Sequence, residues 1–105
     1  MKSISTNPST TVEIQRDAGD ENDPITIQTL FNKIAINYGN RVALMQKDKT
    51  NNEWKGITYK VYREKVLKMA KVFIKLGLEK HGTVAILADN CVEWYIAEMA
   101  AIFAG

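Results

Sequence analysis

Few residues of this 105-residue chain have the side chains that nucleophilic chemistry needs, and those few are separated in sequence. A cysteine–histidine pair would have to use Cys91 and His81, because the sequence holds one residue of each type. His81 precedes Gly82, which favours a surface turn, and Cys91 opens the last expected helix. A thiol at a helix N-terminus can have a lowered pKa, but a small packing residue is the commoner role there. We therefore expect neither residue to be catalytic.

The acidic residues near Cys91 also lack the spacing of a proton-sharing pair or a metal site. Glu93 and Glu98 are five residues apart, so they do not lie side by side on a helix. Asp89 is a single carboxylate beside a helix start, where its negative charge interacts favourably with the helix dipole. One histidine and one cysteine cannot supply the three or four nitrogen and sulfur ligands of a structural zinc site.

Phosphate-binding and hydrolase motifs are absent from the sequence as well. It contains no GxxxxGKS or GxxxxGKT loop, no GxGxxG turn and no GxSxG elbow. The residues by themselves therefore assign no catalytic, cofactor-binding or metal-ligating position.

Basic residues gather on one expected helix, and two interpretations of them stay open. They form either a solvated outer face or a surface for anionic lipid or a nucleotide-bearing partner. No aromatic residues interleave them as in proteins that bind single-stranded nucleic acid, so we expect no nucleic-acid partner. The aromatic pair Trp94 and Tyr95 could stack on a ligand, but we expect core packing. The basic residues are Lys60, Arg63, Lys65, Lys68, Lys71 and Lys75.

The first half of the ordered region predicts a helix followed by a β-hairpin. Apolar residues at helical spacing predict a helix from Ile27 to Tyr38, with Thr26 as N-cap and Gly39 as a left-handed C-terminal stop. The hairpin is expected to pair residues 41–47 with residues 53–58 around a polar turn. Gly56 between Trp54 and Ile57 indicates a bulge.

The second half predicts a helix, a strand and another helix. The stripe from Tyr59 to Leu76 is the clearest element, capped by Thr58 and ended by Gly77. Residues 83–88 are apolar without alternation, which is typical of a parallel strand buried on both faces. The last helix is expected to begin at Asn90, with Glu93 completing an approximate capping box.

Residues 1–25 differ in composition from the rest of the chain. They hold six Ser or Thr, no aromatic residue, two basic residues and five acidic ones, so their net charge is −3. We expect a flexible acidic leader there and one domain over residues 26–105. This segment lacks the apolar run of a secretory signal and is too acidic for a mitochondrial transit peptide. A single cysteine excludes an internal disulfide, and together these features favour a reducing, cytoplasmic setting.

None of the last seven residues, 99–105, has a side chain that is charged or can form a hydrogen bond. A helix that is apolar all round belongs inside a larger body, and a strand buried on both faces needs layers on both sides. The expected fold class is therefore α/β, an incomplete piece of a larger domain ordered helix, hairpin, helix, buried strand, helix. The alternatives are a small compact domain and a dimer that buries this end.

Short strings along the second half of the chain are Ile57-Thr58-Tyr59, Ala70, Leu76-Gly77, Val84-Ala85-Ile86-Leu87, Asn90, Glu93-Trp94 and Ala101-Ile102-Phe103-Ala104-Gly105. Together they resemble the N-terminal region of the adenylate-forming (AMP-binding) enzymes, and among them the acyl-CoA synthetases. The resemblance covers about residues 26–105. His81-Gly82-Thr83 departs from the Gly-Asp that usually precedes the VAI strand, and with Leu76 to Lys80 it is similar to the bubblegum-type long-chain fatty acid synthetases.

The resemblance implies ATP-dependent activation of a long-chain fatty acid through acyl-AMP, followed by transfer to CoA, with Mg²⁺ neutralising the triphosphate. The family's phosphate loop, its adenine and ribose contacts and its C-terminal lysine match no position here, so no site residue is carried over. The shared Asn90, Glu93 and Trp94 have structural roles as cap, capping partner and core ring. ATP, CoA and Mg²⁺ are expected to bind the full-length enzyme and not this piece alone.

The expected partners are the rest of the synthetase chain and, for the complete enzyme, the fatty acid, ATP and CoA. Peripheral association with the endoplasmic reticulum or another membrane fits the same family. A second hypothesis is a short, non-catalytic product that binds a synthetase subunit through its apolar last helix. A third and weaker hypothesis is a membrane-surface module that uses the basic helix.

Overall fold

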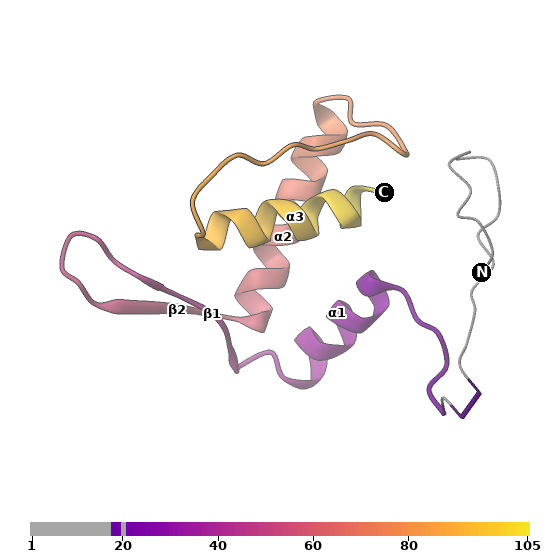
Figure 1. Cartoon of the computed structure of the whole chain (residues 1–105), viewed down its shortest axis with the longest axis horizontal. Coiled ribbons are helices and arrows are strands. Elements are labelled where there is room, and N and C mark those ends of the chain that lie inside the picture. Colours follow the sequence, from indigo (N-terminus) through magenta and orange to yellow (C-terminus); the bar gives the residue numbers. More distant parts are fainter. Residues whose placement is uncertain (1–17, 20) are drawn as a thin grey trace.

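The computed structural model describes residues 18–19 and 21–105 as three helices and a two-stranded hairpin (Figure 1). Helices α2 and α3 cross each other, α1 lies beside the start of α2, and the hairpin projects away from the helices. This small α/β arrangement confirms the expected order of helix, hairpin, helix and last helix. The elements are α1 Ile27–Asn37, β1 Val42–Lys47, β2 Trp54–Thr58, α2 Tyr59–Lys75 and α3 Val92–Ala104.

Helix α1 begins as the sequence predicts and ends differently. The Thr26 hydroxyl accepts a hydrogen bond from the Thr29 amide at 3.1 Å, which satisfies an orphan donor of the first turn. The expected left-handed stop at Gly39 is wrong, because the positive-φ glycines of the described chain are Gly19, Gly77 and Gly105. Gly39 is needed for space instead, since an added Cβ would lie 2.6 Å from the Ala35 carbonyl oxygen.

The hairpin is antiparallel, and its irregularity lies on the strand opposite to the one expected. Val42 pairs with Thr58 while Leu44 pairs with Ile57, so Ala43 is the extra residue and β1 carries the bulge. Gly56 pairs regularly with Met45, which corrects the bulge expected there. A Cβ on Gly56 would lie 3.0 Å from the Val42 side chain, so the glycine makes room across the ladder.

Helix α2 confirms the sequence prediction at both ends. The Thr58 hydroxyl accepts from the Val61 amide at 3.3 Å. Gly77 has φ +99°, and the Leu78 amide donates to the Phe73 carbonyl at 3.0 Å, which closes the helix in a Schellman arrangement. Both ends are therefore set by residues adjacent to the helix in sequence.

The strand expected over residues 83–88 does not form in the described chain. This segment has no regular structure, and Leu87 is 103% exposed. A parallel strand needs a hydrogen-bonded neighbour, and the two described strands pair only with each other. Without such a neighbour, the apolar composition of the segment produces neither a strand nor a buried layer.

The core lies where the three helices meet. Val66 and Ala100 are completely buried, and Phe31 packs edge-to-face on Tyr62, with ring centroids 4.9 Å apart. Phe103 makes a second edge-to-face contact with Phe31 at 5.7 Å. The cluster of buried residues comprises Phe31, Tyr62, Val66, Ala70, Ile96 and Ala100.

The aromatic pair and the apolar end of α3 are less buried than the core residues. Trp94 is half-buried and Tyr95 exposed, so the expected core packing of this pair is wrong; the two rings contact each other at 5.4 Å instead. The apolar end of α3 is half-buried at Ile102 and Phe103. Residues 1–17 and 20 of the expected acidic leader lie outside the described residues, so its flexibility stays a prediction.

Candidate functional site

The junction between β1 and the start of α3 holds a partly open recess and the only cysteine of the sequence. Its volume is about 240 Å³. The recess combines apolar walls with two side-chain amides, a thiol and a phenol, which makes it the candidate functional site. It is lined by Leu44, Met45, Gln46, Asn90, Cys91, Val92 and Tyr95.

The start of α3 is capped from another element. Cys91 is the N-cap, with extended backbone angles of φ −146° and ψ 167°, and its thiol makes no capping hydrogen bond. The Gln46 side chain of β1 accepts a hydrogen bond from the Val92 amide at 2.7 Å and so satisfies one of the orphan donors. The capping box expected from Asn90 and Glu93 is therefore wrong, because the helix begins one residue too late for Asn90 to cap it.

The structure keeps Cys91 and His81 apart. Cys91 precedes α3, whereas the His81 amide donates to the Gly105 carbonyl at the other end of the same helix, at 3.4 Å. A 13-residue helix is roughly 20 Å long, so the two side chains form no nucleophile–base pair. His81 lies in an exposed turn with φ +66°, as its position before Gly82 predicts.

Acidic residues do not form a metal site in the described part of the chain. No three His, Cys, Asp or Glu side chains there come close enough together to hold an ion. Asp89, Glu93 and Glu98 are each exposed. The described residues therefore offer no ligand set for the Mg²⁺ that an ATP-dependent reaction would require.

Tyr62 is the ionisable residue most affected by burial. Desolvation raises the pKa of its phenol, and the negative charges of Glu98 and of ionised Tyr95 and Tyr59 would raise it further. The hydroxyl donates to the Tyr95 carbonyl at 3.1 Å. Tyr62 is thus a neutral core residue that ties α2 to α3, and it is no acid–base group near neutral pH.

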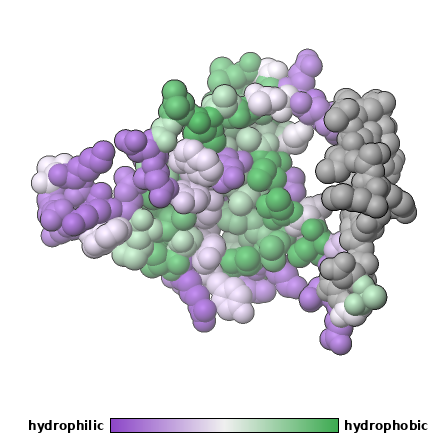
Figure 2. All heavy atoms as spheres, in the orientation of Figure 1, coloured by the Kyte–Doolittle hydropathy of each residue, from purple (hydrophilic) through white to green (hydrophobic). Residues whose placement is uncertain are grey.

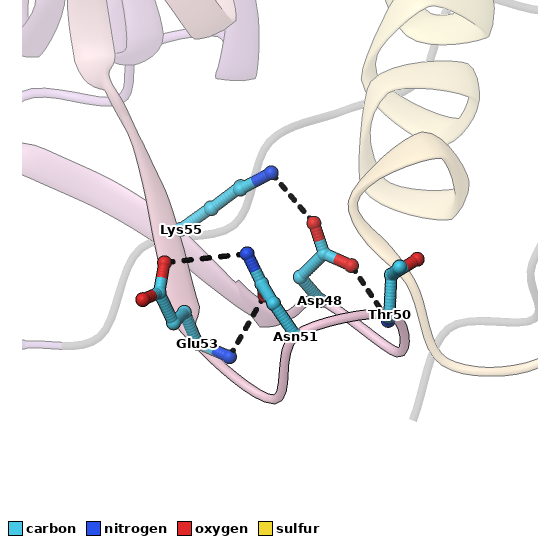
Figure 3. Close-up of polar contacts among 5 residues, drawn as sticks. All are labelled: Asp48, Thr50, Asn51, Glu53 and Lys55. Carbon is cyan, nitrogen blue, oxygen red and sulfur yellow. Dashed lines mark hydrogen bonds and ion pairs between the residues drawn. The ribbon is translucent and has the colours of Figure 1, made fainter.

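The hairpin turn contains a cluster of polar side chains whose hydrogen bonds stabilise the turn, called here the turn clamp (Figure 3). Lys55 donates to one Asp48 oxygen at 2.6 Å, and the Thr50 amide donates to the other at 2.8 Å. Asn51 accepts from the Glu53 amide at 3.1 Å and donates to its carboxylate at 3.3 Å. The hydrogen bond from Lys55, followed by that from Thr50, lowers the pKa of Asp48. The polar groups of the turn therefore form hydrogen bonds with one another.

The basic helix α2 presents all five of its lysines to solvent. Lys60, Lys65, Lys68, Lys71 and Lys75 are exposed, as expected of an outer face. Arg63 differs, because it is half-buried and its Nε donates to the Asn32 side chain at 2.7 Å, which joins α2 to α1. Among the residues that the structure describes, no helix is both long and apolar enough to cross a bilayer.

Sequence reasoning missed the polar side chains that connect distant elements. Gln46 caps α3 across 46 residues, and the Gln28 amide donates to the Ile102 carbonyl across 74 residues at 3.0 Å. No local pattern indicates either contact, because each partner is specified by the fold. The one available signal is negative: cysteine at a helix N-cap is a weak hydrogen-bond acceptor, so another acceptor is needed.

Comparison with known proteins gives a consistent assignment. The model of the family described as "AMP-binding enzyme" matches residues 31–105. The chain is 46% identical over 82 residues to the long-chain-fatty-acid--CoA ligase ACSBG2 of Xenopus laevis, covering 78% of this chain and 11% of that protein. Identity is 44% to ACSBG2 of Gallus gallus and 40% to ACSBG1 of Rattus norvegicus, each over 82 residues, 78% of this chain and 10% and 11% of those proteins.

The chain spans about a tenth of the length of the curated relatives it matches. No solved structure matches the chain. The likeness therefore rests on sequence, and it confirms the resemblance to acyl-CoA synthetases drawn from the short strings.

Proposed function

Because this chain belongs to the AMP-binding enzyme family, we propose that it forms part of the AMP-binding domain of a long-chain fatty acid–CoA ligase. The observation that carries the proposal is the 46% identity to a ligase of that name over 78% of the chain. The domain part would comprise residues 26–105, in keeping with the family match over residues 31–105.

The activity proposed for the whole protein is the two-step activation of a long-chain fatty acid. The carboxylate would attack the α-phosphate of ATP and release pyrophosphate, and the CoA thiol would then displace AMP from the acyl-AMP. We assign the chain to the bubblegum-type branch because it carries the His81-Gly82-Thr83 variant and because its sequence is similar to ACSBG1 and ACSBG2. ATP, CoA and Mg²⁺ would act in the whole enzyme, in the cytoplasm or at the periphery of the endoplasmic reticulum.

Within that enzyme, we propose that this segment is a scaffold and has no activity by itself. No described residue assembles a phosphate loop, a nucleophile–base pair or a metal site. Large apolar side chains are exposed over the helices and the segment before α3, and Figure 2 shows such surface in view beside the hydrophilic hairpin tip. Leu87, which is 103% exposed, would be covered by the remainder of the synthetase.

A chimeric ligase tests the proposal. Residues 31–105 would replace the matching segment of the Xenopus laevis ligase, and formation of fatty acyl-CoA from a labelled long-chain fatty acid would be measured. We expect the chimera to keep its activity. Double replacement of His81 and Cys91 by Ala should leave that activity unchanged, because neither side chain has a chemical role. A chimera that folds and yet forms no acyl-CoA would contradict the proposal.

The proposed lack of activity of the chain alone has its own test. The purified 105-residue chain is expected to catalyse no fatty-acid-dependent exchange of pyrophosphate into ATP. Exchange above the level of a buffer control would show that the segment is catalytically competent and would overturn this part of the proposal.

The exposed apolar residues also favour a second candidate function, a non-catalytic module that binds a synthetase subunit. Size-exclusion chromatography with the Xenopus laevis ligase distinguishes the two. Co-elution with the complete ligase would support the module, whereas separate elution of a monomeric, cooperatively melting chain would count against it.

A further inference from the structure

The outward surface of α2 carries five exposed lysines, Lys60, Lys65, Lys68, Lys71 and Lys75, called here the lysine face. At 3.6 residues per turn they lie within roughly 140° of arc and extend over roughly 22 Å of helix. The opposite side of α2 holds the buried Tyr62, Val66 and Ala70. The packing of the helix therefore turns the lysine face away from the core.

The charges of the lysine face are not neutralised by the described part of the chain. None of the five lysines forms an ion pair there, and the described ion pair joins Lys55 to Asp48 on the hairpin. Glu64 is the single acidic residue of α2. A surface with five cations and one anion carries a strong positive potential at close range.

Apolar side chains are exposed on the same arc and directly beside it. Val61, Val72 and Leu76 are 36%, 46% and 80% exposed. Beside them, an open groove of about 310 Å³ lies between α2 and α3. Its apolar lining residues are Met69, Val72 and Ile96, and its charged ones are Lys65, Lys68 and Glu93. A basic face that only contacts water has no need of exposed aliphatic side chains, so their presence indicates a partner with an apolar part.

We propose that the lysine face and this groove form a docking surface for an anionic lipid bilayer. The lysines would contact the headgroup phosphates and carboxylates, and Val72, Leu76 and the groove would contact the acyl-chain boundary. Clusters of four to eight basic residues on an amphipathic helix are typical of binding to an anionic membrane. The mixture of lysines with exposed aliphatic residues favours lipid over a nucleic-acid backbone, which offers no apolar layer to α2.

The proposal does not depend on the ligase activity, because it rests only on the exposed residues of α2 and α3. Co-sedimentation of the 105-residue chain with vesicles tests it. The vesicles would be phosphatidylcholine alone or phosphatidylcholine mixed with phosphatidylserine. We expect binding only to the second kind, and its loss when salt rises from about 0.1 M to about 1 M, where the screening length falls to roughly 3 Å.

Two variants of equal charge locate the surface. Replacement of Lys68, Lys71 and Lys75 by Gln should lower partitioning onto phosphatidylserine vesicles on the order of 100-fold. Replacement of Lys33, Lys47 and Lys49 by Gln removes the same charge from α1 and the hairpin and should lower it less than about threefold. All six lysines are exposed and glutamine keeps helix propensity, so circular dichroism and urea unfolding should match the parent chain.

Three results would overturn the proposal. One is the absence of binding to phosphatidylserine vesicles at low salt. Another is an equal loss in the two triple variants, which would mean attraction by net charge alone. The third is tighter binding to double-stranded RNA than to vesicles, lost in the α2 variant, which would assign the lysine face to nucleic acid.

Discussion

Helices α2 and α3 pack on the same core but are delimited in different ways. The start of α2 is capped by Thr58, the residue directly before it, and its end is closed at Gly77, two residues after it. The start of α3 is capped by Gln46 from β1, and its Ile102 carbonyl accepts from Gln28 of α1. One helix carries its own boundary signals, whereas the other takes its polar partners from elements far away in sequence.

The difference shows which contacts hold the molecule together. Caps within α2 stabilise one helix, whereas the capping contacts of α3 also fix β1 and α1 against it. The α3 contacts are therefore tertiary contacts as well as helix caps, and their loss should be felt in two elements at once.

The largest expected effect comes from removing the core that both helices share. Val66→Ala deletes two methyl groups from a side chain with 0% exposure and should destabilise the chain by about 2–3 kcal/mol. Urea unfolding followed by circular dichroism measures this. Leu87→Ala is the matched control, because that side chain is fully exposed and its loss should cost less than about 0.5 kcal/mol. Similar costs for the two would mean that the junction of helices is not the core.

The two caps can be compared directly. Thr58→Ala and Gln46→Ala should each cost about 1 kcal/mol. Hydrogen exchange should distinguish them: the first variant loses protection at Val61, whereas the second loses it at Val92 and in β1. Gln46→Glu keeps the acceptor and places a negative charge at a helix N-terminus, so protection of Val92 should return. If Gln46→Ala leaves both α3 and β1 unchanged, the distant cap is not significant.

A local cap can be added to α3. Cys91 has the extended backbone of an N-cap but no side-chain cap, so Cys91→Ser should stabilise the chain by about 0.5 kcal/mol and slow exchange at the Glu93 amide, because the Trp94 amide already donates to the Cys91 carbonyl at 3.2 Å. Cys91→Ala is the control of similar size and should bring no gain. Equal unfolding free energies for the Ser and Ala variants would show that the Gln46 contact already suffices.

The smallest effect lies in the hairpin turn, away from both helices. The Lys55 hydrogen bond lowers the pKa of Asp48 below its ordinary value of 3.8, so the associated stabilisation is fully present above that pH and is lost as pH falls through the lowered pKa. NMR titration should find the Asp48 midpoint below 3.8, and Lys55→Gln should raise it. Lys49→Gln is the control and should leave it in place; an unchanged midpoint in Lys55→Gln would contradict the clamp.

The elements that the sequence predicts correctly are those whose signals are local. Thr26 and Thr58 cap the expected helices, and the polar turn between the expected strands confirms the hairpin. The strand over residues 83–88 is wrong because a strand is a property of two segments, and apolar composition does not supply the second one. The candidate site follows the same rule, since its recess depends on Gln46 meeting the start of α3.

The amino-acid sequence by itself determined the helical stripes, the local caps, the absence of a phosphate loop and the membership of the AMP-binding family. The tertiary structure alone decided that Cys91 and His81 lie at opposite ends of α3, that Gln46 caps that helix, and that Val72 and Leu76 stay exposed beside the lysine face. The physical reason is distance along the chain. Periodicity and capping act over a few residues, whereas the partner of an orphan amide or an apolar edge is chosen only when the packed helices bring remote segments together.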